Sequence, residues 1–297
     1  MPQDREIAAL FKLLEDDDAR IAEAAWEAVL KRAERARMAL AAVADGIDDD
    51  GARARGLLES IRRRELIVEM EALAGEDGEA KVDLQAGALL IARFGDAGAD
   101  PDRVHAALDE LAAGLQDMAG PSGGPLPQLE AMNRHLVDAN GFSYERSRQR
   151  GADDCYLHRV LERRRGLPIS LALVWILVGR RLGATVHGVN MPGHFLAAWD
   201  ANGRRVFFDP ADSGRPLSRA DCARLLSQAG VAFSDGLLSP VSSRLILVRL
   251  INNLIDLSER REGPDSADAA WWDRLRAALL SDAPPHEAGT ETGPASD

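Results

Sequence analysis

The longest apolar run of the chain lies in the middle of the sequence. Between residues 169 and 178 every side chain except Ser170 is apolar, and a helix that is apolar all the way round is buried on every side. Gly166-Leu167-Pro168 precedes the run, and proline suits the first helical position because its fixed φ fits and its missing N–H needs no partner there. Arg180-Arg181 and Gly183 follow, as cations and glycine do at helix C-termini. The pattern therefore predicts a fully buried central helix.

After this helix, the apolar positions change to the alternation typical of β-strands. Residues 185–189 alternate between polar and apolar side chains, and Met191-Pro192-Gly193 predicts a turn. Residues 195–199 and 205–209 flank Asn202-Gly203, and this dipeptide is the strongest short-range signal of a β-hairpin. The sequence therefore predicts an α+β core, in which the central helix packs on a small antiparallel sheet of two or three strands.

The N-terminal region, residues 1–75, has the periodicity of helices. A first apolar stripe and a second one lie on either side of the acidic residues 15–18, and the stripes consist of Ile7, Leu10, Phe11 and Leu14, then Ile21, Ala25 and Val29. Two helices joined in this way resemble a single HEAT-type repeat. One such unit cannot bury its own apolar face, so we expect either a cap docked on the residues that follow or an arm that binds a partner. A further helix is expected to carry Leu57, Ile61, Ile67 and Met70, with Arg62-Arg63-Arg64 on a solvated face.

Helices are also predicted on both sides of the core. The glycine-rich and acidic residues 75–78 predict a boundary, with a core domain at residues 76–238 and C-terminal helices at residues 239–282. Inside the core, a seam of helically spaced apolar residues indicates intramolecular packing, because it is too short for a coiled-coil dimer; it comprises Val104, Leu108, Leu111, Leu115 and Met118. A loop is expected at residues 121–125. Residues 283–297 are rich in Pro, Gly, Ser, Thr and acidic side chains, and predict a disordered tail.

Composition excludes several classes of protein. With 46% hydrophobic and 28% charged residues among 297, the chain is an ordinary globular protein. Its 48 acidic and 36 basic residues give a formal charge of −12, which disfavours nucleic acid as a partner. No apolar run is long enough to cross a membrane, and no secretory signal is recognised at the N-terminus. Because Cys155 and Cys222 form neither a CxxC motif nor a cluster with histidines, we expect a cytoplasmic protein without a metal or other cofactor.

The candidate chemistry centres on one histidine and one aspartate of the predicted sheet. His194 begins the first strand of the hairpin and Asp209 ends the second, and a carboxylate can hold an imidazole in the tautomer that accepts a proton. Cys155 lies in the first turn of a helix expected from Cys155 to Arg164, where a thiol can have a lowered pKa. The alternatives are a structural histidine tied to Asp209, and a small half-buried residue at position 155.

Three segments resemble one known family. VLERRRGLPISLALVWILVGRRLG, GVNMPGHFLAAW and FFDPADSG are similar to the bacterial SirB-type proteins, which are transglutaminase-like proteins named as invasion regulators or without known function. The resemblance runs from about Val82 to Leu226, and it implies the transglutaminase-like (papain-like) fold, in which a cysteine begins the central helix. Tetratricopeptide-like repeats often follow in this family, and residues 239–282 hold at most one degenerate pair. Ala211 departs from the family pattern, which usually has an aromatic residue there.

The same resemblance assigns the nucleophile position to Pro168. In the family pattern the nucleophile lies two residues after a glycine, here Gly166, and some fifteen before the glycine that ends the helix, here Gly183. Pro168 carries no nucleophile, and the resemblance implies that many members with this proline are not working thiol enzymes. Ser170 is the nearest substitute, yet at roughly 100° per residue its side chain points about 200° away from position 168.

Two functions therefore remain open. We favour a non-catalytic protein that uses a vestigial His194–Asp209 pair as part of a binding or regulatory site, with Asn190, Gly193 and Arg165 expected to contact a peptide or small ligand. The alternative is a hydrolase or acyltransferase. In such an enzyme Cys155 or Ser170 would be the nucleophile, and it would act together with His194 and Asp209. A protein or peptide partner is expected in the first case, and the oligomeric state is not predicted.

Overall fold

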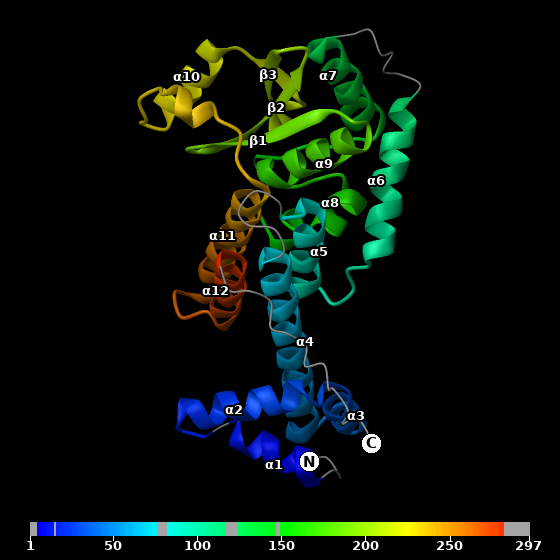
Figure 1. The fold of residues 1–297 in the computed structure, drawn as a ribbon, viewed down its shortest axis with the longest axis vertical. Coiled ribbons are helices and arrows are strands. Elements are labelled where there is room, and N and C mark those ends of the chain that lie inside the picture. The colour runs from blue at the N-terminus through cyan, green and yellow to red at the C-terminus, as the bar shows by residue number, and fades with distance from the viewer. Residues whose placement is uncertain (1–4, 15, 76–81, 117–123, 147–148, 282–297) are drawn as a thin grey trace, which may run out of the picture. The chain divides into compact units, whose positions relative to one another are not determined.

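The computed structural model describes residues 5–14, 16–75, 82–116, 124–146 and 149–281. Glu15, Met118, most of the predicted linker at residues 75–78, most of the predicted loop at residues 121–125 and the whole predicted tail lie outside these residues. The chain forms two compact units, Met1–Glu69 and Met70–Asp297. Figure 1 labels the α-helices and the strands β1 to β3.

The first unit is helical and has its own core. Helices α1 (Arg5–Leu13), α2 (Ala19–Leu30) and α3 (Ala33–Ala44) pack with the first part of the long helix α4 (Asp49–Gly75). All buried members of the core belong to these helices, namely Ile7, Phe11, Val29, Ala36, Leu40, Ala54 and Ile61. The apolar faces of the first two helices are thus covered within the region itself.

The arginine run of α4 is not the solvated face that the sequence predicted. Arg64 forms an ion pair of 2.8 Å with Glu23 and lies over the ring of Trp26, 4.4 Å from its centroid. Arg62 and Arg63 both pair with Glu59, and these contacts lower the pKa of that carboxyl, although its burial acts in the opposite direction. The arginine run therefore forms ion pairs within α4 and links α4 to α2.

The second unit is built on a four-stranded antiparallel sheet. Its strands are β1 (Thr185–Met191), β2 (His194–Ala201), β3 (Arg204–Asp209) and β4 (Arg215–Leu217), in that spatial order. The hairpin predicted at Asn202-Gly203 is confirmed, and both turn residues have positive φ, +53° and +71°. β1 and β2 form a second tight hairpin, in which Met191 pairs with His194 across Pro192-Gly193. The sequence did not predict β4.

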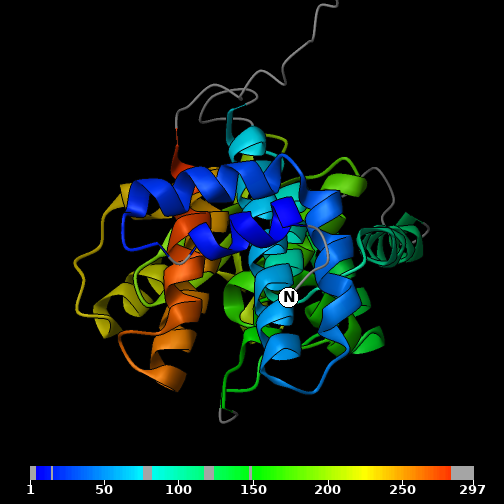
Figure 2. The same ribbon diagram turned by 90° about the horizontal axis from the view of Figure 1, so that it is seen from below.

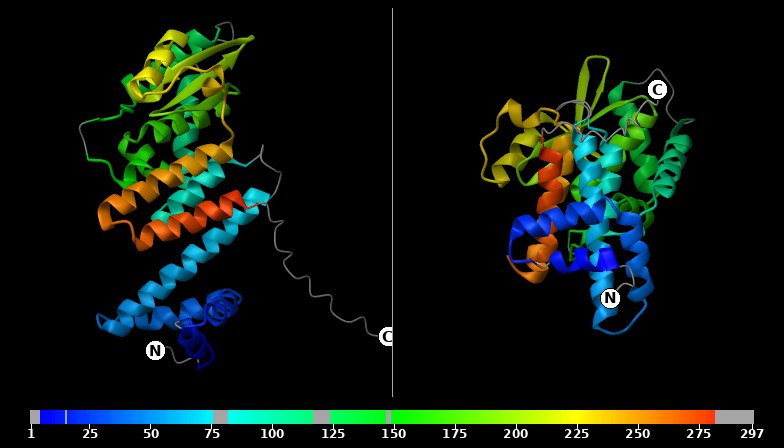
Figure 3. Two further views of the ribbon diagram at one scale, coloured as in Figure 1. Left: turned by 90° about the vertical axis from the view of Figure 1, so that its left-hand side faces the viewer. Right: turned by 60° about the horizontal axis from the view of Figure 1, so that its bottom comes forward.

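The central helix α9 (Pro168–Arg181) is buried at every position from Ile169 to Gly179, as its sequence predicts. It packs against β1 and β2. The short helix α10 (Arg219–Gln228) and the 3₁₀ turn Asp235–Leu238 supply side chains to a second cluster, which Val189, Leu196, Phe207, Leu217, Leu226 and Leu238 share. Figure 3 shows the sheet between these two layers.

The remaining helices surround this core. They are α5 (Leu84–Gly95), α6 (Pro101–Gln116), α7 (Pro125–Asn133), α8 (Leu157–Arg163), α11 (Ser243–Glu262) and α12 (Ala267–Leu280). α6 packs on α8 and α9, so its apolar seam is intramolecular, as predicted. α11 and α12 lie side by side, which the view from below in Figure 2 also shows. Within the described residues, no helix has the length and apolar character required to traverse a bilayer.

Candidate functional site

The sheet brings together the two residues of the predicted acid–base pair. His194 is the first residue of β2 and follows Gly193, whose φ is +74°. Asp209 is the last residue of β3. Because β2 and β3 are antiparallel neighbours, the start of one lies beside the end of the other. The imidazole Nε2 is 3.9 Å from the carboxylate Oδ2, a distance for an ion pair but longer than a hydrogen bond.

The backbone and the burial of Asp209 both act on its carboxyl group. Asp209 is 3% exposed, and its Oδ1 accepts a hydrogen bond of 2.9 Å from the Ala211 N–H at the start of the 3₁₀ turn Pro210–Asp212. Burial raises the pKa of this carboxyl above its ordinary value, although the Ala211 N–H and the charge of His194 act against that rise. The carboxyl is therefore oriented by a backbone N–H, and its burial disfavours the ionised form.

A cavity of about 300 Å³ lies beside this pair. The N-terminus of α9 contributes Leu167, Pro168 and Ile169, and the start of β2 contributes Gly193, His194 and Phe195. The other lining residues are Tyr144, Arg146, Arg150, Ala211, Arg249 and Asn253. Pro168, expected at the nucleophile position, and His194 thus share one cavity.

The two alternative nucleophiles are absent from the lining of this cavity. Cys155 is fully buried, and α8 begins at Leu157, so the prediction that the thiol lies in a first helical turn was wrong. Burial and the adjacent charge of Asp154 raise the pKa of the Cys155 thiol far above its usual range. Ser170 is also fully buried, and its Oγ has no hydrogen-bond partner among the described residues. Both side chains are thus buried away from the cavity that His194 lines.

Of the three residues expected to contact a ligand, Gly193 alone lines this cavity. Asn190 is an exposed residue of β1 that pairs with Phe195. Arg165 lies 3.5 Å from Glu145 and lines with it a small hollow that adjoins the cavity, since Tyr144, Arg150 and Leu167 line both. The charge of Arg165 is thus already balanced, because an acidic residue of the preceding segment lies beside it.

Sequence reasoning missed most of the polar lining. Tyr144 and Arg150 come from an irregular segment without periodicity, and the Arg150 Nη2 donates a hydrogen bond of 2.8 Å to the Tyr144 hydroxyl. Arg249 and Asn253 come from α11. Their spacing of four residues places them on one face of the helix, but other polar residues of α11 hide this signal.

Asn133 connects the central helix to the segment that follows Asp209. Its Oδ1 accepts a hydrogen bond of 2.9 Å from the Trp175 Nε1, and its Nδ2 donates one of 2.7 Å to the Gly214 carbonyl oxygen. The Gly214 N–H in turn donates to the Asp209 carbonyl at 2.9 Å. A side chain at Gly214 would collide with Asn133, so this glycine lets the turn after Asp209 approach α7 closely.

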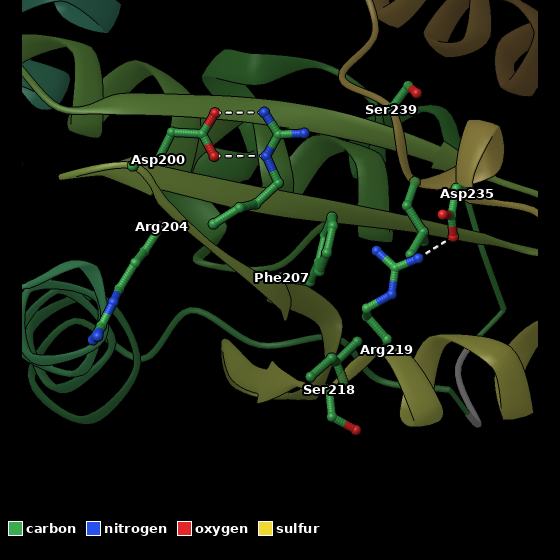
Figure 4. Close-up of a pocket in the computed structure, with 11 residues that line it drawn as sticks. Asp200, Arg204, Phe207, Ser218, Arg219, Asp235 and Ser239 are labelled. Carbon is green, nitrogen blue, oxygen red and sulfur yellow. Dashed lines mark hydrogen bonds and ion pairs between the residues drawn. The ribbon is translucent and has the colours of Figure 1, made fainter.

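A second hollow, of about 630 Å³, lies at the other end of the hairpin and shares no lining residue with the first. Figure 4 shows the bidentate ion pair of Arg205 with Asp200, at 2.7 and 2.6 Å, and the pair of Arg219 with Asp235. Phe207 lies between them. The two arginines shown in ion pairs in this hollow are therefore neutralised by carboxylates of the protein.

Metal-ligating side chains do not gather in either hollow. Over the whole described part of the chain, no group of three or more His, Cys, Asp or Glu side chains is arranged to hold a metal ion.

Comparison with known proteins matches residues 102–252 to the family described as the Transglutaminase-like superfamily. A UPF0162 protein of Xylella fastidiosa is 37% identical over 133 residues, which are 43% of this chain and 47% of that protein. A UPF0162 protein of Pseudomonas aeruginosa is 34% identical over 167 residues, 54% of this chain and 59% of that protein. Human F-box only protein 21 is 34% identical over 147 residues, 47% of this chain but 23% of that protein.

These matches are partial. The chain covers less than two thirds of the length of each of these relatives. No solved structure matches the chain at a significant level.

Proposed function

Because this chain belongs to the transglutaminase-like superfamily, we propose that it is a non-catalytic, SirB-type protein of the cytoplasm with a HEAT-like N-terminal region. In this proposal the fold serves as a binding or regulatory module, and the cavity beside His194 holds a peptide or a small ligand. Its biological partner is then a protein or peptide rather than nucleic acid, in keeping with the formal charge of −12.

The observation that carries the proposal is the residue at the start of the central helix. Pro168 lines the cavity that His194 enters, and it has neither a nucleophilic group nor an N–H. A histidine and a carboxylate can activate a nucleophile only if one lies within reach of the imidazole. Cys155 and Ser170 are fully buried and do not line that cavity. This arrangement supports binding more than acyl transfer.

The test is a search for turnover that depends on His194. Peptides that carry glutamine, with and without an added primary amine, are incubated with the wild-type protein, His194→Ala and His187→Ala. His187 is the matched control because it lies on β1 beside Asp200, at 3.5 Å, outside the cavity. We expect release of ammonia at background in all three. Turnover that His194→Ala abolishes and His187→Ala retains would contradict the proposal.

Restoring a thiol provides the complementary measurement. In Pro168→Cys the new thiol is placed in the first turn of α9, where the helix dipole favours a thiolate. Burial raises the pKa of both native thiols, so labelling by iodoacetamide reports on position 168. We expect labelling at neutral pH at least tenfold faster than in the wild type, and slower labelling when His194→Ala is added. Equal rates in all variants would contradict the placement of position 168 beside the imidazole.

A further inference from the structure

The cavity beside His194 is cationic. Arg146, Arg150 and Arg249 line it together with the histidine, and none of its twelve lining residues is acidic. The arginines come from two segments about a hundred residues apart in sequence, the irregular segment before α8 and helix α11. Tertiary structure therefore gathers like charges at one cavity, which costs electrostatic energy unless an opposite charge is present.

Arg249 shows most clearly that a counter-charge is missing. Its Nη1 donates a long hydrogen bond of 3.3 Å to the Met191 carbonyl oxygen, and its guanidinium lies over the Phe195 ring, 5.6 Å from the centroid. No carboxylate of the described residues forms an ion pair with it. Burial alone lowers the pKa of this guanidinium, without a contribution from any charged neighbour. A partly buried cation in such surroundings is stabilised by an anion.

The second hollow provides the contrast within the same domain. There Arg205 and Arg219 are paired with Asp200 and Asp235, as Figure 4 shows. An anion entering that hollow would have to compete with these carboxylates. The lining of the cavity beside His194 offers no such competition. The nearest carboxylates in the adjoining hollow, Glu145 and Asp154, share that hollow with Arg150 and not with Arg249.

The start of α9 adds to the positive character of the cavity. The N-cap residue Leu167 has no side chain that accepts a hydrogen bond, and Pro168 follows it. The first N–H groups of a helix lack partners within the helix, and its dipole is positive at this end. Much of the lining is nevertheless apolar, and it consists of Leu167, Pro168, Phe195 and Ala211.

We propose that this cavity binds an oxyanion, a carboxylate or phosphoryl group, carried on a small apolar body. The guanidinium of Arg249 receives the oxyanion, Arg146 and Arg150 at the rim add to its attraction, and the lining at Leu167, Pro168 and Phe195 contacts the body of the ligand. This inference rests on the proposed function and specifies its ligand. Guanidinium groups bind carboxylates and phosphates alike, so the experiment distinguishes the two sources.

The experiment compares three probes with similar apolar bodies. N-acetyl-leucine carries a carboxylate, N-acetyl-leucinamide is its neutral analogue, and isopentyl phosphate carries a phosphoryl group. Dissociation constants are measured by ligand-observed NMR for the full chain. We expect an anionic probe to bind at least tenfold more tightly than the amide, and its affinity to fall as salt is added. The tighter of the two anions identifies the oxyanion.

Variants then locate the binding. Arg249→Gln should weaken binding of the preferred anion about tenfold or more, since a hydrogen bond to a charged group is lost, and leave the affinity for the amide unchanged. Arg219→Gln, in the second hollow, is the matched control and should bind as the wild type does. If circular dichroism shows that Arg249→Gln does not fold, the exposed pair Arg146→Gln and Arg150→Gln replaces it, with a loss of several-fold expected.

Three results would overturn the inference. These are binding of both anionic probes no tighter than that of the amide, undiminished binding of the preferred anion by the arginine variants, and no binding of any probe. Binding of both anions no tighter than that of the amide would leave the proposed binding module intact and remove only its preference for anions. The proposed function itself fails on a different observation, namely turnover that depends on His194.

Discussion

At the scale of single residues, Asp209 shows how the fold constrains a carboxyl group. The side chain is nearly inaccessible to water, and burial is the largest influence on its pKa, which is raised. The hydrogen bond from the Ala211 N–H and the nearby His194 favour the ionised form without outweighing burial. The surroundings of Asp209 therefore orient its carboxyl group, and on balance they disfavour the ionised form.

A pH dependence of stability follows from this residue. The folded protein retains the proton of Asp209 to a higher pH than the unfolded chain does. The stabilising contribution of the protonated carboxyl is thus complete below the ordinary value of 3.8 and is lost as pH rises through the raised pKa. Asp209→Asn stays neutral and keeps an oxygen for the Ala211 N–H. We expect its free energy of unfolding, relative to that of the wild type, to increase from acid to neutral pH in urea titrations.

Asp256→Asn is the matched control for this titration. Asp256 is an exposed residue of α11 and is not among the groups that shift the pKa of Asp209, and a surface substitution of this kind changes stability by about 0.5 kcal/mol or less. A relative stability of Asp209→Asn that falls toward neutral pH would mean that the ionised carboxyl is favoured in the fold.

The sequence predicted the residues of the site that belong to regular, local patterns. Gly193, His194 and Asp209 stand at the ends of strands that alternation and turn residues identify, so the hairpin predicts that His194 and Asp209 lie close together. The place of Pro168 beside them came from the family resemblance. Arg249 lies on α11, which packs on α5, α9 and α12 and brings its guanidinium to the β1–β2 hairpin. Its approach to the cavity was therefore not predictable from local periodicity.

At the scale of elements, the differences between prediction and structure have local causes. β4 is three residues long and contains Pro216, so it has too little alternation to be recognised and depends on its pairing with β3. The helix expected from Cys155 begins at Leu157 because residues 152–154 form a separate 3₁₀ turn. The central helix could be predicted without knowledge of its neighbours, because its apolar run indicates burial on all sides.

Arg244 connects the ends of three helices in the second unit. It is 6% exposed, near the start of α11. Its Nη1 donates to the Leu279 carbonyl oxygen at 2.7 Å, and its Nη2 to that of Ala74 at 2.9 Å. Both carbonyls belong to the last turns of their helices, α12 and α4, where the backbone has no intrahelical partner. One guanidinium thus satisfies two helix C-termini.

Replacing this side chain tests the connection. Arg244→Met keeps a long apolar side chain but leaves both carbonyls without their charged donor, and we expect the free energy of unfolding to fall by about 3 kcal/mol. Arg260→Met, an exposed arginine of the same helix, should change it by about 0.5 kcal/mol or less. Urea denaturation of the full chain measures both. Similar losses in the two variants would show that the carbonyls of Leu279 and Ala74 find other partners.

At the scale of the whole molecule, the chain has two compact units with separate apolar cores. The buried residues around Phe11 all come from helices α1 to α4, whereas the central helix and the sheet make the core of the second unit. The match to the transglutaminase-like superfamily, residues 102–252, lies within the second unit. The site and its supporting contacts are therefore built from that unit's own side chains.

Separate cores predict separate responses to core mutations. Phe11 is 1% exposed. Replacing a core Phe by Ala lowers the free energy of unfolding by about 3–5 kcal/mol, and with separate cores this loss falls on the first unit alone. In Phe11→Ala we expect hydrogen exchange measured by mass spectrometry to accelerate in residues 5–44, with no change in α9 or β2. Leu247→Ala, fully buried in α11, should give the reverse pattern. Faster exchange throughout the chain in either variant would mean that the two cores unfold as one cooperative unit.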